Sequence, residues 1–357
     1  MVLYRILEKE IDRLVARAIR EALFPGVEIF FAQGKSVVYH ECFGRYDSNG
    51  TALERCSVFD LASLTKPIAT SAAILHLIDA QKLSLRSSLT EVVPEFFRRE
   101  KERITLFHLL THTSGLPAWR DLYSPRFDRR QGWAKLCDTE LDCPPGQKVV
   151  YSCLGFLVLS EIVRRVSGSS LADYCREHIF GPIRTKRLCF RPGKSCRKIV
   201  PTAFCPIRNR YLRGSVHDEN AYLFDEEGGN AGLFGTVGDI HRFCRMVFGE
   251  GTLEGETVLS REAVRCWTES RLPEHLSQRA LGWDVNGRHE EHRSCGEKMP
   301  IGSLGHTGFT GTSLWMDKRT ELVAIILSNR VNISREGNLA GMRAFRPRIH
   351  DLLLSMV

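Results

Sequence analysis

The sequence predicts an α+β fold, in which an antiparallel sheet built from both chain ends is flanked by terminal helices and a mainly helical domain is inserted between its halves. Strand-like runs of β-branched and aromatic residues lie near both termini. The long middle of the 357-residue chain carries helical patterns separated by Gly and Pro loops. We expect a discontinuous sheet domain of residues 1–60 and 295–357, a helical domain of residues 61–294, and a ligand-binding cleft between them.

The N-terminal elements are a helix and a hairpin. Residues 3–22 place apolar side chains at three- and four-residue intervals, which predicts a helix with one apolar face that ends before Pro25. We expect this face to pack against the sheet. Residues 27–32 and 36–43 are two short strand-like runs, and the Gln33-Gly34-Lys35 segment between them is typical of a hairpin turn.

The rest of the chain continues the pattern. Helices are expected over Pro67–Lys82, Leu154–Val166 and Leu171–His178. Near the end, residues 312–316 and 322–327 are strand-like and separated by a polar turn, and a last helix is expected over 338–356.

Composition points to an ordinary globular enzyme. Hydrophobic residues make up 43% of the chain and charged residues 26%, which argues against a disordered or membrane protein. The formal charge of +8 comes from dispersed Lys and Arg, so we expect solvated faces, a mild preference for anionic substrates and no nucleic-acid partner. No run is apolar enough for a secretory signal or a membrane span, which predicts a cytoplasmic protein unless a precursor segment was removed.

The cysteine pattern predicts neither metal nor disulfides. The twelve cysteines run from Cys42 to Cys295 without a C-x-x-C pair, and we expect them to be free thiols. The His289-Glu290-Glu291-His292 run near Cys295 resembles a metal clip, but its polar setting favours a loop. No metal or cofactor is expected.

The first candidate for chemistry is Ser63-Leu64-Thr65-Lys66, at the start of a helical pattern. Residues three apart lie one turn apart on the same helix face, so the Lys66 amine is expected beside the Ser63 hydroxyl. A lysine can take a serine proton only if its pKa is lowered toward neutrality. This motif is short, and on its own it is more often structural than catalytic.

Two further segments complete the candidate site. Tyr151 precedes the helix of residues 154–166 and could relay a proton, provided that adjacent cations lower its pKa; alone it is an ordinary half-buried tyrosine. The segment Gly305-His306-Thr307-Gly308-Phe309-Thr310-Gly311 is expected to form a Gly-rich turn before a strand. The Phe309 N–H and the Ser63 N–H could then form an oxyanion hole.

Together these motifs resemble the superfamily of serine β-lactamases, DD-peptidases and related esterases, whose marks are S-x-x-K, Y-x-N and K-T-G or H-T-G. The sequence around these motifs supports the resemblance from about residue 26 to 332, most clearly in the segments 109–117, 216–221 and 232–234. The resemblance implies a β-lactamase/transpeptidase-like fold and an acyl-enzyme mechanism, as in hydrolases related to class C β-lactamases.

The resemblance also implies roles for individual residues. Ser63 would attack a carbonyl, Lys66 and Tyr151 would share the acid–base work, and His306 would orient or help to protonate the leaving group. Which of Lys66 and Tyr151 is the base stays open. The expected substrate-binding and oxyanion residues are Ser63, Thr307, which would contact a substrate carboxylate, Gly308, Phe309 and Cys153.

Two departures from the family pattern affect these expectations. Cys153 stands where the family has Asn, and a thiol is a weaker donor than an amide, so amides and β-lactams are less securely predicted than esters. In Gly229-Asn230-Ala231-Gly232, relatives often have His in second place, which indicates a local change near the cleft wall. The remaining histidines His76, His108 and His112 are expected in polar or capping roles.

Three functions remain open. The first is an acyl hydrolase of small esters or amides. The second is a D-alanyl-D-alanine carboxypeptidase-like protein or β-lactamase that binds cell-wall peptides or β-lactams. The third is a catalytically silent scaffold or ligand sensor, which only Cys153 favours. The expected partner is a small ester, amide or β-lactam-like molecule, and the sequence does not determine the oligomeric state.

Overall fold

A computed structural model describes residues 2–46, 50–97, 99–125, 128–193, 196–273, 275–287, 294–334 and 338–357. Within these residues, the main sheet has six strands in the order β10-β11-β12-β13-β1-β2, and every neighbouring pair is antiparallel. Its strands are β1 (Gly26–Gln33), β2 (Ser36–Gly44), β10 (Asp284–Val285), β11 (Leu304–Thr307), β12 (Ser313–Asp317) and β13 (Leu322–Ser328).

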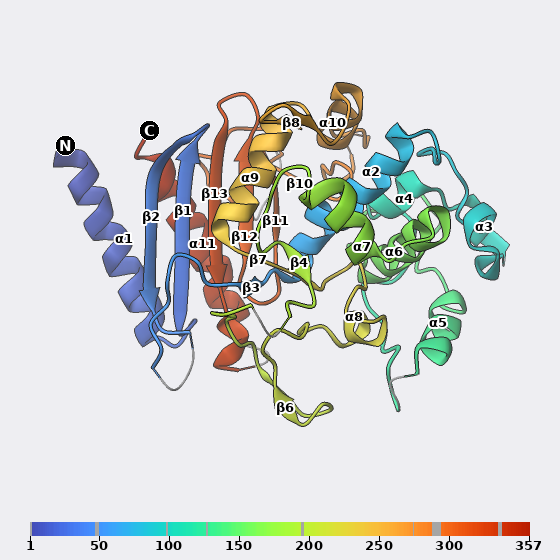
Figure 1. Ribbon diagram of the computed structural model, residues 1–357, viewed down its shortest axis with the longest axis horizontal. Helices are drawn as coiled ribbons and strands as arrows, with labels where there is room; N and C mark the ends of the chain where they lie inside the picture. Colours follow the sequence, from blue (N-terminus) through green and yellow to red (C-terminus); the bar gives the residue numbers. More distant parts are fainter. Residues whose placement is uncertain are drawn as a thin grey trace.

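The two chain ends meet in the middle of this sheet, as the sequence predicts. β1 forms the expected hairpin with β2 and pairs on its other edge with β13, from Val27 opposite Ser328 to Gln33 opposite Leu322. Both strands are buried along almost their whole length, which explains why they do not alternate between apolar and polar residues. The charged residue within β1, Glu28, is buried and hydrogen-bonded to His40. The mainly helical part lies beside the sheet (Figure 1).

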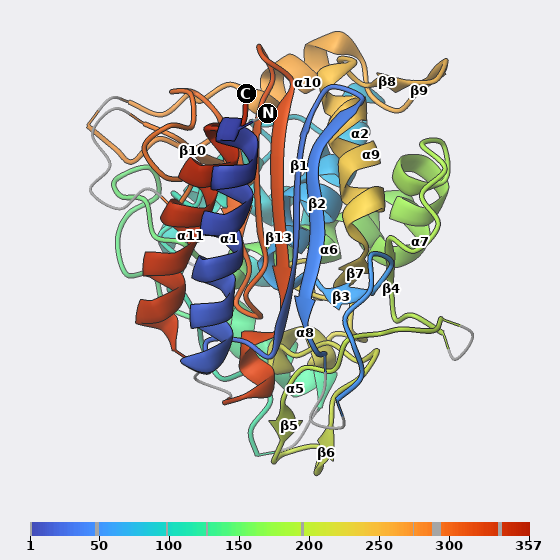
Figure 2. The ribbon, with the colours of Figure 1, turned by 90° about the vertical axis from the view of Figure 1, so that its left-hand side faces the viewer.

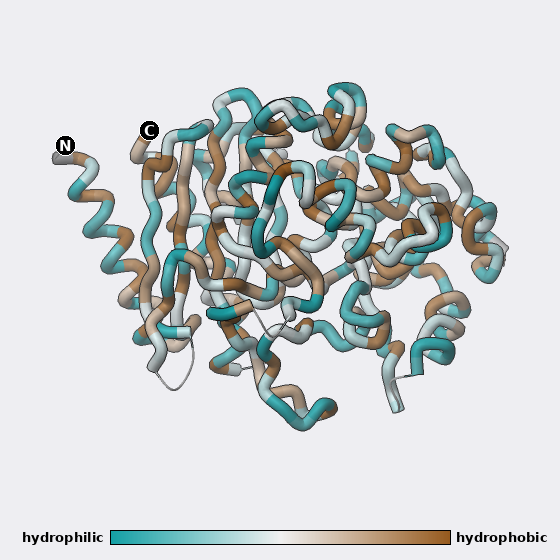
Figure 3. Tube along the Cα trace, in the orientation of Figure 1, coloured by the Kyte–Doolittle hydropathy of each residue, from teal (hydrophilic) through white to brown (hydrophobic). Residues whose placement is uncertain are grey.

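Helices cover both faces of the sheet. α1 (Val2–Arg20) and α11 (Leu339–Leu354) lie side by side on one face (Figure 2). The hydropathy of α1 alternates along its length (Figure 3), and its apolar side chains Ile11 and Val15 join Phe345 and Ile349 of α11 in one buried cluster. On the other face, α9 (Val237–Phe248) packs against β13.

The inserted part of the chain is mainly helical. It contains α2 (Ala72–Asp79), α3 (Leu89–Val92), α4 (Leu106–Leu110), α5 (Arg129–Cys137), α6 (Cys153–Ser167), α7 (Leu171–Cys175), α8 (Glu219–Leu223) and α10 (Arg261–Thr268). Short strands pair locally: β3 (Phe59–Asp60), β7 (Leu233–Gly235) and β4 (Cys189–Phe190) in one small sheet, β5 (Phe204–Cys205) with β6 (Arg210–Tyr211), and β8 (Thr252–Leu253) with β9 (Glu256–Thr257).

Two predicted helices are irregular. The helix expected over Pro67–Lys82 begins as a 3-10 turn at Ala62–Leu64, continues as a π-helix at Lys66–Ser71, and is α-helical only over Ala72–Asp79. Pro67 has no N–H to donate to the preceding turn, which is compatible with this change of hydrogen-bond pattern. The helix expected over Leu171–His178 likewise changes to a π-helix at Arg176–Phe180.

The sequence predicted that the whole Gly-rich segment 305–311 forms a turn, but only part of it does. Its first half belongs to β11, and only the residues after Thr307 form the turn to β12. Gly305 lies opposite Trp315, and a Cβ on Gly305 would stand 2.1 Å from Trp315 Cδ2. The glycine therefore allows a tryptophan side chain to lie across a strand, and does not mark the end of that strand.

Four other expectations concern the domain division, the cysteines, the 289–292 run and membrane spans. The sheet includes β10, which lies before the expected boundary at residue 295, and the division into two domains stays a prediction. All twelve cysteines fall within the described residues and are free thiols, as predicted. The 289–292 run lies outside the described residues. Among the helices that the structure describes, none is both long and apolar enough to cross a membrane.

Candidate active site

Ser63 lies immediately after β3, at the entry to the irregular helix. β3 pairs with β7, and Ala62, the first residue of the 3-10 turn, adopts a left-handed backbone conformation with a φ of 47°. Lys66 Nζ lies 3.0 Å from Ser63 Oγ and donates a hydrogen bond to it. The amine and the hydroxyl are therefore adjacent, as the three-residue spacing predicts.

Lys66 is held by three acceptors. Its side chain is completely buried, and Nζ donates to Asn230 O at 2.9 Å and to Cys153 Sγ at 3.6 Å as well as to Ser63. Nζ also lies 4.8 Å from the centre of the Tyr151 ring. The 229–232 segment, where the sequence indicated a local change, therefore provides a backbone carbonyl that accepts a hydrogen bond from Lys66. Cys153, which stands where the resemblance predicts an asparagine, provides a thiol as a further acceptor.

Tyr151 is positioned by the start of α6. Ser152 caps this helix, because its Oγ accepts the Gly155 N–H, and its own N–H donates to His112 Nδ1 at 3.0 Å. The His112 ring lies 4.6 Å from the Tyr151 ring. His112 therefore has the polar role that was expected of it, and it fixes the backbone beside the tyrosine.

The pKa values of Lys66 and Tyr151 depend on burial and on the neighbouring groups. Burial acts to lower the pKa of Lys66, but the neighbouring Cys153 and Tyr151 act in the opposite direction and leave this pKa above its ordinary value. The pKa of Tyr151 is also raised, by burial, against the opposing effect of Lys66. A lowered pKa was the condition for either group to accept the Ser63 proton, and in the free site neither pKa is lowered. Lys66 is an ammonium there, and Tyr151 is a neutral phenol.

His306 and Gly308 come from the end of β11 and the turn that follows it. The His306 ring is buried, lies 5.7 Å from the Tyr151 ring and has Nδ1 2.8 Å from Thr307 O. Burial lowers the pKa of His306 to about 4, so the ring is neutral near pH 7. Gly308 is needed for close approach, because a Cβ there would lie 2.8 Å from Leu61 O.

The predicted site residues surround one cavity of about 500 Å³. Ser63, Tyr151, Cys153, His306, Thr307, Gly308 and Phe309 all line it, and Lys66 is hydrogen-bonded to Ser63 at its floor. The remaining lining residues were not among the predicted site residues: Asp60, Ala62, Trp119, His217, Asp218, Glu219, Ala231, Arg279, Asp284, Leu339 and Arg346.

Two arginines line this cavity, together with the four carboxylates of Asp60, Asp218, Glu219 and Asp284. Arg346 of α11 donates to Gly308 O at 3.0 Å and to Thr312 O at 2.9 Å, and its Nε has no acceptor among the described residues. Burial lowers the pKa of Arg346 to about 10, which leaves it charged. Arg279 forms an ion pair with Asp284. Neither arginine belongs to a sequence motif, so their presence at the cavity could not be predicted. The tertiary fold alone brings them there.

The mouth of the cavity is apolar. Trp119 is 52% exposed, Phe309 50% and Leu339 43%, and all three line the same cavity. Trp119 belongs to a loop that the sequence marks only by its lack of regular pattern. The cavity therefore combines a nucleophile at its floor, arginines and carboxylates on its wall and apolar side chains at its rim.

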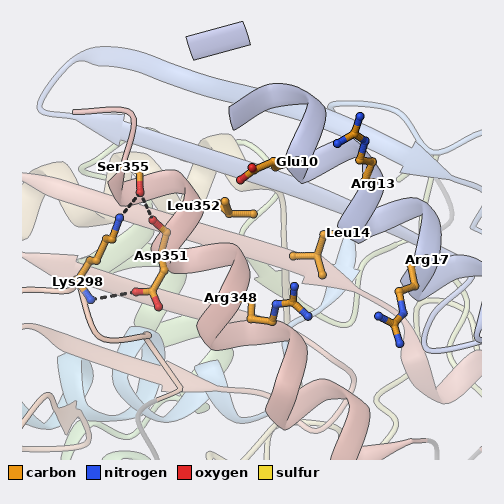
Figure 4. A pocket seen from close by; sticks show the side chains of 9 residues that line it. All are labelled: Glu10, Arg13, Leu14, Arg17, Lys298, Arg348, Asp351, Leu352 and Ser355. Carbon is orange, nitrogen blue, oxygen red and sulfur yellow. Dashed lines mark hydrogen bonds between the residues drawn. The ribbon is translucent and has the colours of Figure 1, made fainter. Parts of the chain in front are cut away.

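A second cavity, of about 520 Å³, lies between α1 and α11 (Figure 4). Its polar groups include Arg13, Arg17 and Arg348, and Lys298 and Asp351 are joined by hydrogen bonds to each other and to Ser355. The Lys298 amine also donates to a serine hydroxyl, that of Ser355, but this pair is exposed, whereas Lys66 at the first cavity is completely buried. The chemistry expected from the sequence is therefore confined to the first cavity.

Curated relatives match most of this chain. An N-acetylmuramyl-L-alanine amidase of Bacillus subtilis (strain 168) is 26% identical over 90% of this chain and 80% of its own length. A protein of Escherichia coli (strain K12) named "Putative D-alanyl-D-alanine carboxypeptidase" is 28% identical over 90% of this chain and 82% of its own.

A solved structure matches the whole fold. EstCE1, described as a hydrolase with promiscuous acyltransferase activity, superposes with a TM-score of 0.78 at 19% identity, over 99% of this chain and 100% of its own. The fold is thus of the β-lactamase/transpeptidase type, as the motifs implied. The family profile described as "Beta-lactamase" matches residues 11–345, and the chain therefore belongs to the β-lactamase family of hydrolases.

Proposed function

We propose that this protein is a serine hydrolase that forms an acyl-enzyme at Ser63 and hydrolyses small esters or amides. The observation that carries the proposal is the 3.0 Å hydrogen bond between Lys66 Nζ and Ser63 Oγ at the floor of the 500 Å³ cavity, with Tyr151 beside both. A hydroxyl becomes a competent nucleophile when a neighbouring base accepts its proton.

The acylation step follows from the protonation states of the pair. Since Lys66 is an ammonium and Tyr151 a phenol in the free site, the reactive form lacks one of these two protons. The pair then accepts the Ser63 proton while Oγ bonds to the substrate carbonyl carbon. The N–H groups of Ser63 and Phe309 stabilise the oxyanion, and collapse expels the leaving group, which receives a proton from the pair.

Deacylation reverses these roles. Water loses a proton to the same pair as its oxygen bonds to the acyl carbon, and the proton passes to Ser63 Oγ when the ester bond breaks. His306 is neutral near pH 7, so it acts by orienting groups and donating or accepting one hydrogen bond, and does not act as an imidazolium acid. In this scheme the Lys66 and Tyr151 side chains accept and donate the proton in every transfer.

The cavity wall favours a substrate that carries a carboxylate beside its scissile carbonyl. Arg279 is paired with Asp284, so Arg346, which forms no ion pair among the described residues, supplies the positive charge, and the Thr307 hydroxyl is available for the carboxylate. The exposed Trp119 and Phe309 suit an apolar or ring-bearing group at the mouth. Cys153, in place of an amide side chain, favours esters over amides.

A second candidate is action on D-alanyl peptides or β-lactams. It is favoured by the relatives named as an amidase and a carboxypeptidase, and by the Arg346 guanidinium on the cavity wall. The third, a catalytically silent scaffold or sensor, is favoured only by Cys153. A mass increase of the intact protein after incubation with a phosphonate or a β-lactam would exclude it.

The deciding experiment compares turnover of p-nitrophenyl esters, D-alanyl peptides and β-lactams by the wild type, Ser63→Ala and Ser167→Ala. Ser167 is the matched control, because its hydroxyl donates to Val163 O within its own helix. We expect ester turnover to fall by at least about 1,000-fold in Ser63→Ala and to stay near wild type in Ser167→Ala. Equal turnover by the wild type and Ser63→Ala would reject the proposal.

A further inference from the structure

Asp60 is a buried carboxylate at the start of the nucleophile segment, three residues before Ser63. Its side chain is only 2% exposed, and its two oxygens accept different backbone N–H groups. Oδ1 accepts the Ala62 N–H at 2.8 Å, and Oδ2 accepts the His217 N–H at 2.7 Å. A buried carboxylate is costly unless it is well hydrogen-bonded, so these two contacts define where the group can sit.

The first contact concerns the backbone that presents Ser63. Ala62 has a φ of 47°, a left-handed conformation that is unfavourable for a residue with a Cβ by about 1–2 kcal/mol. The Asp60 Oδ1 bond to the Ala62 N–H closes a local side-chain turn around this residue. The direction of the next residue, Ser63, therefore depends on a conformation that the Asp60 carboxylate helps to hold.

The second contact concerns Phe309. The His217 ring stacks on the Phe309 ring, with 5.7 Å between centroids and 25° between planes. The Arg330 guanidinium lies 4.5 Å from the centre of the same Phe309 ring. Phe309 is half exposed, so these two neighbours provide much of what fixes it. One of these neighbours, His217, is held by the hydrogen bond from its backbone N–H to the Asp60 carboxylate.

Backbone contacts join the same two segments directly. Asp60 O accepts the Thr310 hydroxyl at 2.9 Å, and Leu61 O accepts the Thr312 hydroxyl at 3.0 Å. Two backbone carbonyls of the segment that carries Ser63 therefore accept hydrogen bonds from threonine hydroxyls around the turn that carries Phe309. The carboxylate of Asp60 adds a third connection, through His217.

We infer that Asp60 is a positioning residue, which sets the Ser63 N–H and the Phe309 N–H relative to each other so that both can stabilise the same oxyanion. This inference rests on the proposed function, because it assigns Asp60 a part in that reaction. Donors of an oxyanion hole act by fixed geometry, and an error of about 1 Å costs on the order of 100-fold in rate. The effect belongs to the transition state, so it lowers kcat and leaves KM nearly unchanged.

The test is Asp60→Asn, with Asp239→Asn as the matched control. Asn preserves size, but it places an NH₂ group against one of the two N–H donors. Asp239 is an equally buried carboxylate outside the cavity, where it accepts the Lys186 N–H at 2.8 Å and the Arg187 N–H at 3.1 Å. Both variants lose comparable backbone hydrogen bonds, so both should lower the melting temperature.

The two variants should differ in catalysis. Active sites are first counted by titration with a fluorophosphonate, and kcat and KM are then measured on a p-nitrophenyl ester. We expect kcat per titrated site to fall about 100-fold in Asp60→Asn with KM changed less than threefold, and to stay within twofold of wild type in Asp239→Asn. An Asp60→Asn kcat within threefold of wild type, or an equal loss in Asp239→Asn, would overturn the inference.

If Asp60→Asn does not fold, the variant His217→Ala tests the same inference. It keeps the backbone N–H that Asp60 accepts and removes the ring that stacks on Phe309. A loss in kcat of about tenfold at constant KM supports the inference, and an unchanged kcat contradicts it. Failure of the proposed function is separate: it would appear as turnover retained in Ser63→Ala, whatever the behaviour of the Asp60 variant.

Discussion

The Lys66 ammonium donates to the Cys153 thiol over 3.6 Å, at the position where the family carries an asparagine. An asparagine side chain can accept from the lysine and at the same time donate its NH₂ group to a substrate carbonyl. Cys153 provides an acceptor for Lys66 and only a weak donor for the substrate. The lysine is therefore held in place, while one expected contact to amide substrates is lost.

Cys153→Asn should restore that contact. A neutral hydrogen bond contributes about 0.5–1.5 kcal/mol, so kcat/KM for amide or β-lactam substrates should rise about 3- to 10-fold, and that for esters should change less. Steady-state kinetics on a matched ester and amide of the same acyl group measure this ratio. Cys153→Ser is the control, because it changes the donor without adding an amide. A ratio that does not move in Cys153→Asn would show that the thiol does not set the preference.

Activity should increase with pH through the alkaline range. The pKa values of Lys66 and Tyr151 are both raised, and the reactive form has one proton fewer than the free site. Log kcat/KM for an uncharged ester should therefore rise with a slope near one until the apparent pKa of the pair is reached. Lys66→Ala should lose this dependence together with at least about 100-fold of the activity. A profile already flat between pH 6 and 8 would contradict the assigned protonation states.

Much of the site could be predicted because its chemistry is encoded locally. The three-residue spacing of Ser63 and Lys66 fixes their contact on any helical turn, and the glycines around His306 indicate close backbone approach. The terminal strands are also evident, since β1 and β13 are buried runs made mostly of apolar residues.

What could not be predicted depends on the tertiary fold. Arg346 and Arg279 reach the cavity from segments without a recognisable motif, and Trp119 lies in an irregular loop. The direction of the Lys66 pKa shift could not be predicted for the same reason. It depends on the arrangement of Cys153 and Tyr151 around Nζ, which is a property of the assembled site.

Trp119 should influence substrate choice more than chemistry. Its side chain is half exposed at the mouth of the cavity, where it can cover an apolar or ring-bearing acyl group. We expect Trp119→Ala to lower kcat/KM for aryl or long-chain esters about tenfold, mainly through KM, and to leave the acetyl ester nearly unaffected. Kinetics on a series of esters with one leaving group and increasing acyl size check this. Equal losses across the series would assign Trp119 a general structural role.

Acid should destabilise the protein through its buried neutral histidines. Burial lowers the pKa of His350 from 6.5 to about 3, so between these values the unfolded chain binds a proton that the folded chain does not. Stability is therefore lost as pH falls below about 6.5, by about 2 kcal/mol at pH 5 for this one group. His350→Gln cannot titrate and should flatten the decline by that amount, as measured by urea unfolding at pH 7 and pH 5. A decline of unchanged steepness would contradict the assignment.

The central claim is that the Ser63 hydroxyl is the group that becomes acylated. The most direct measurement is to incubate the protein with a fluorophosphonate, digest it and locate the adduct by mass spectrometry, in the wild type and in Ser63→Ala. The account predicts one adduct per chain, on the peptide containing Ser63, and none in the variant. An adduct on Cys153, or modification that persists in Ser63→Ala, would contradict it.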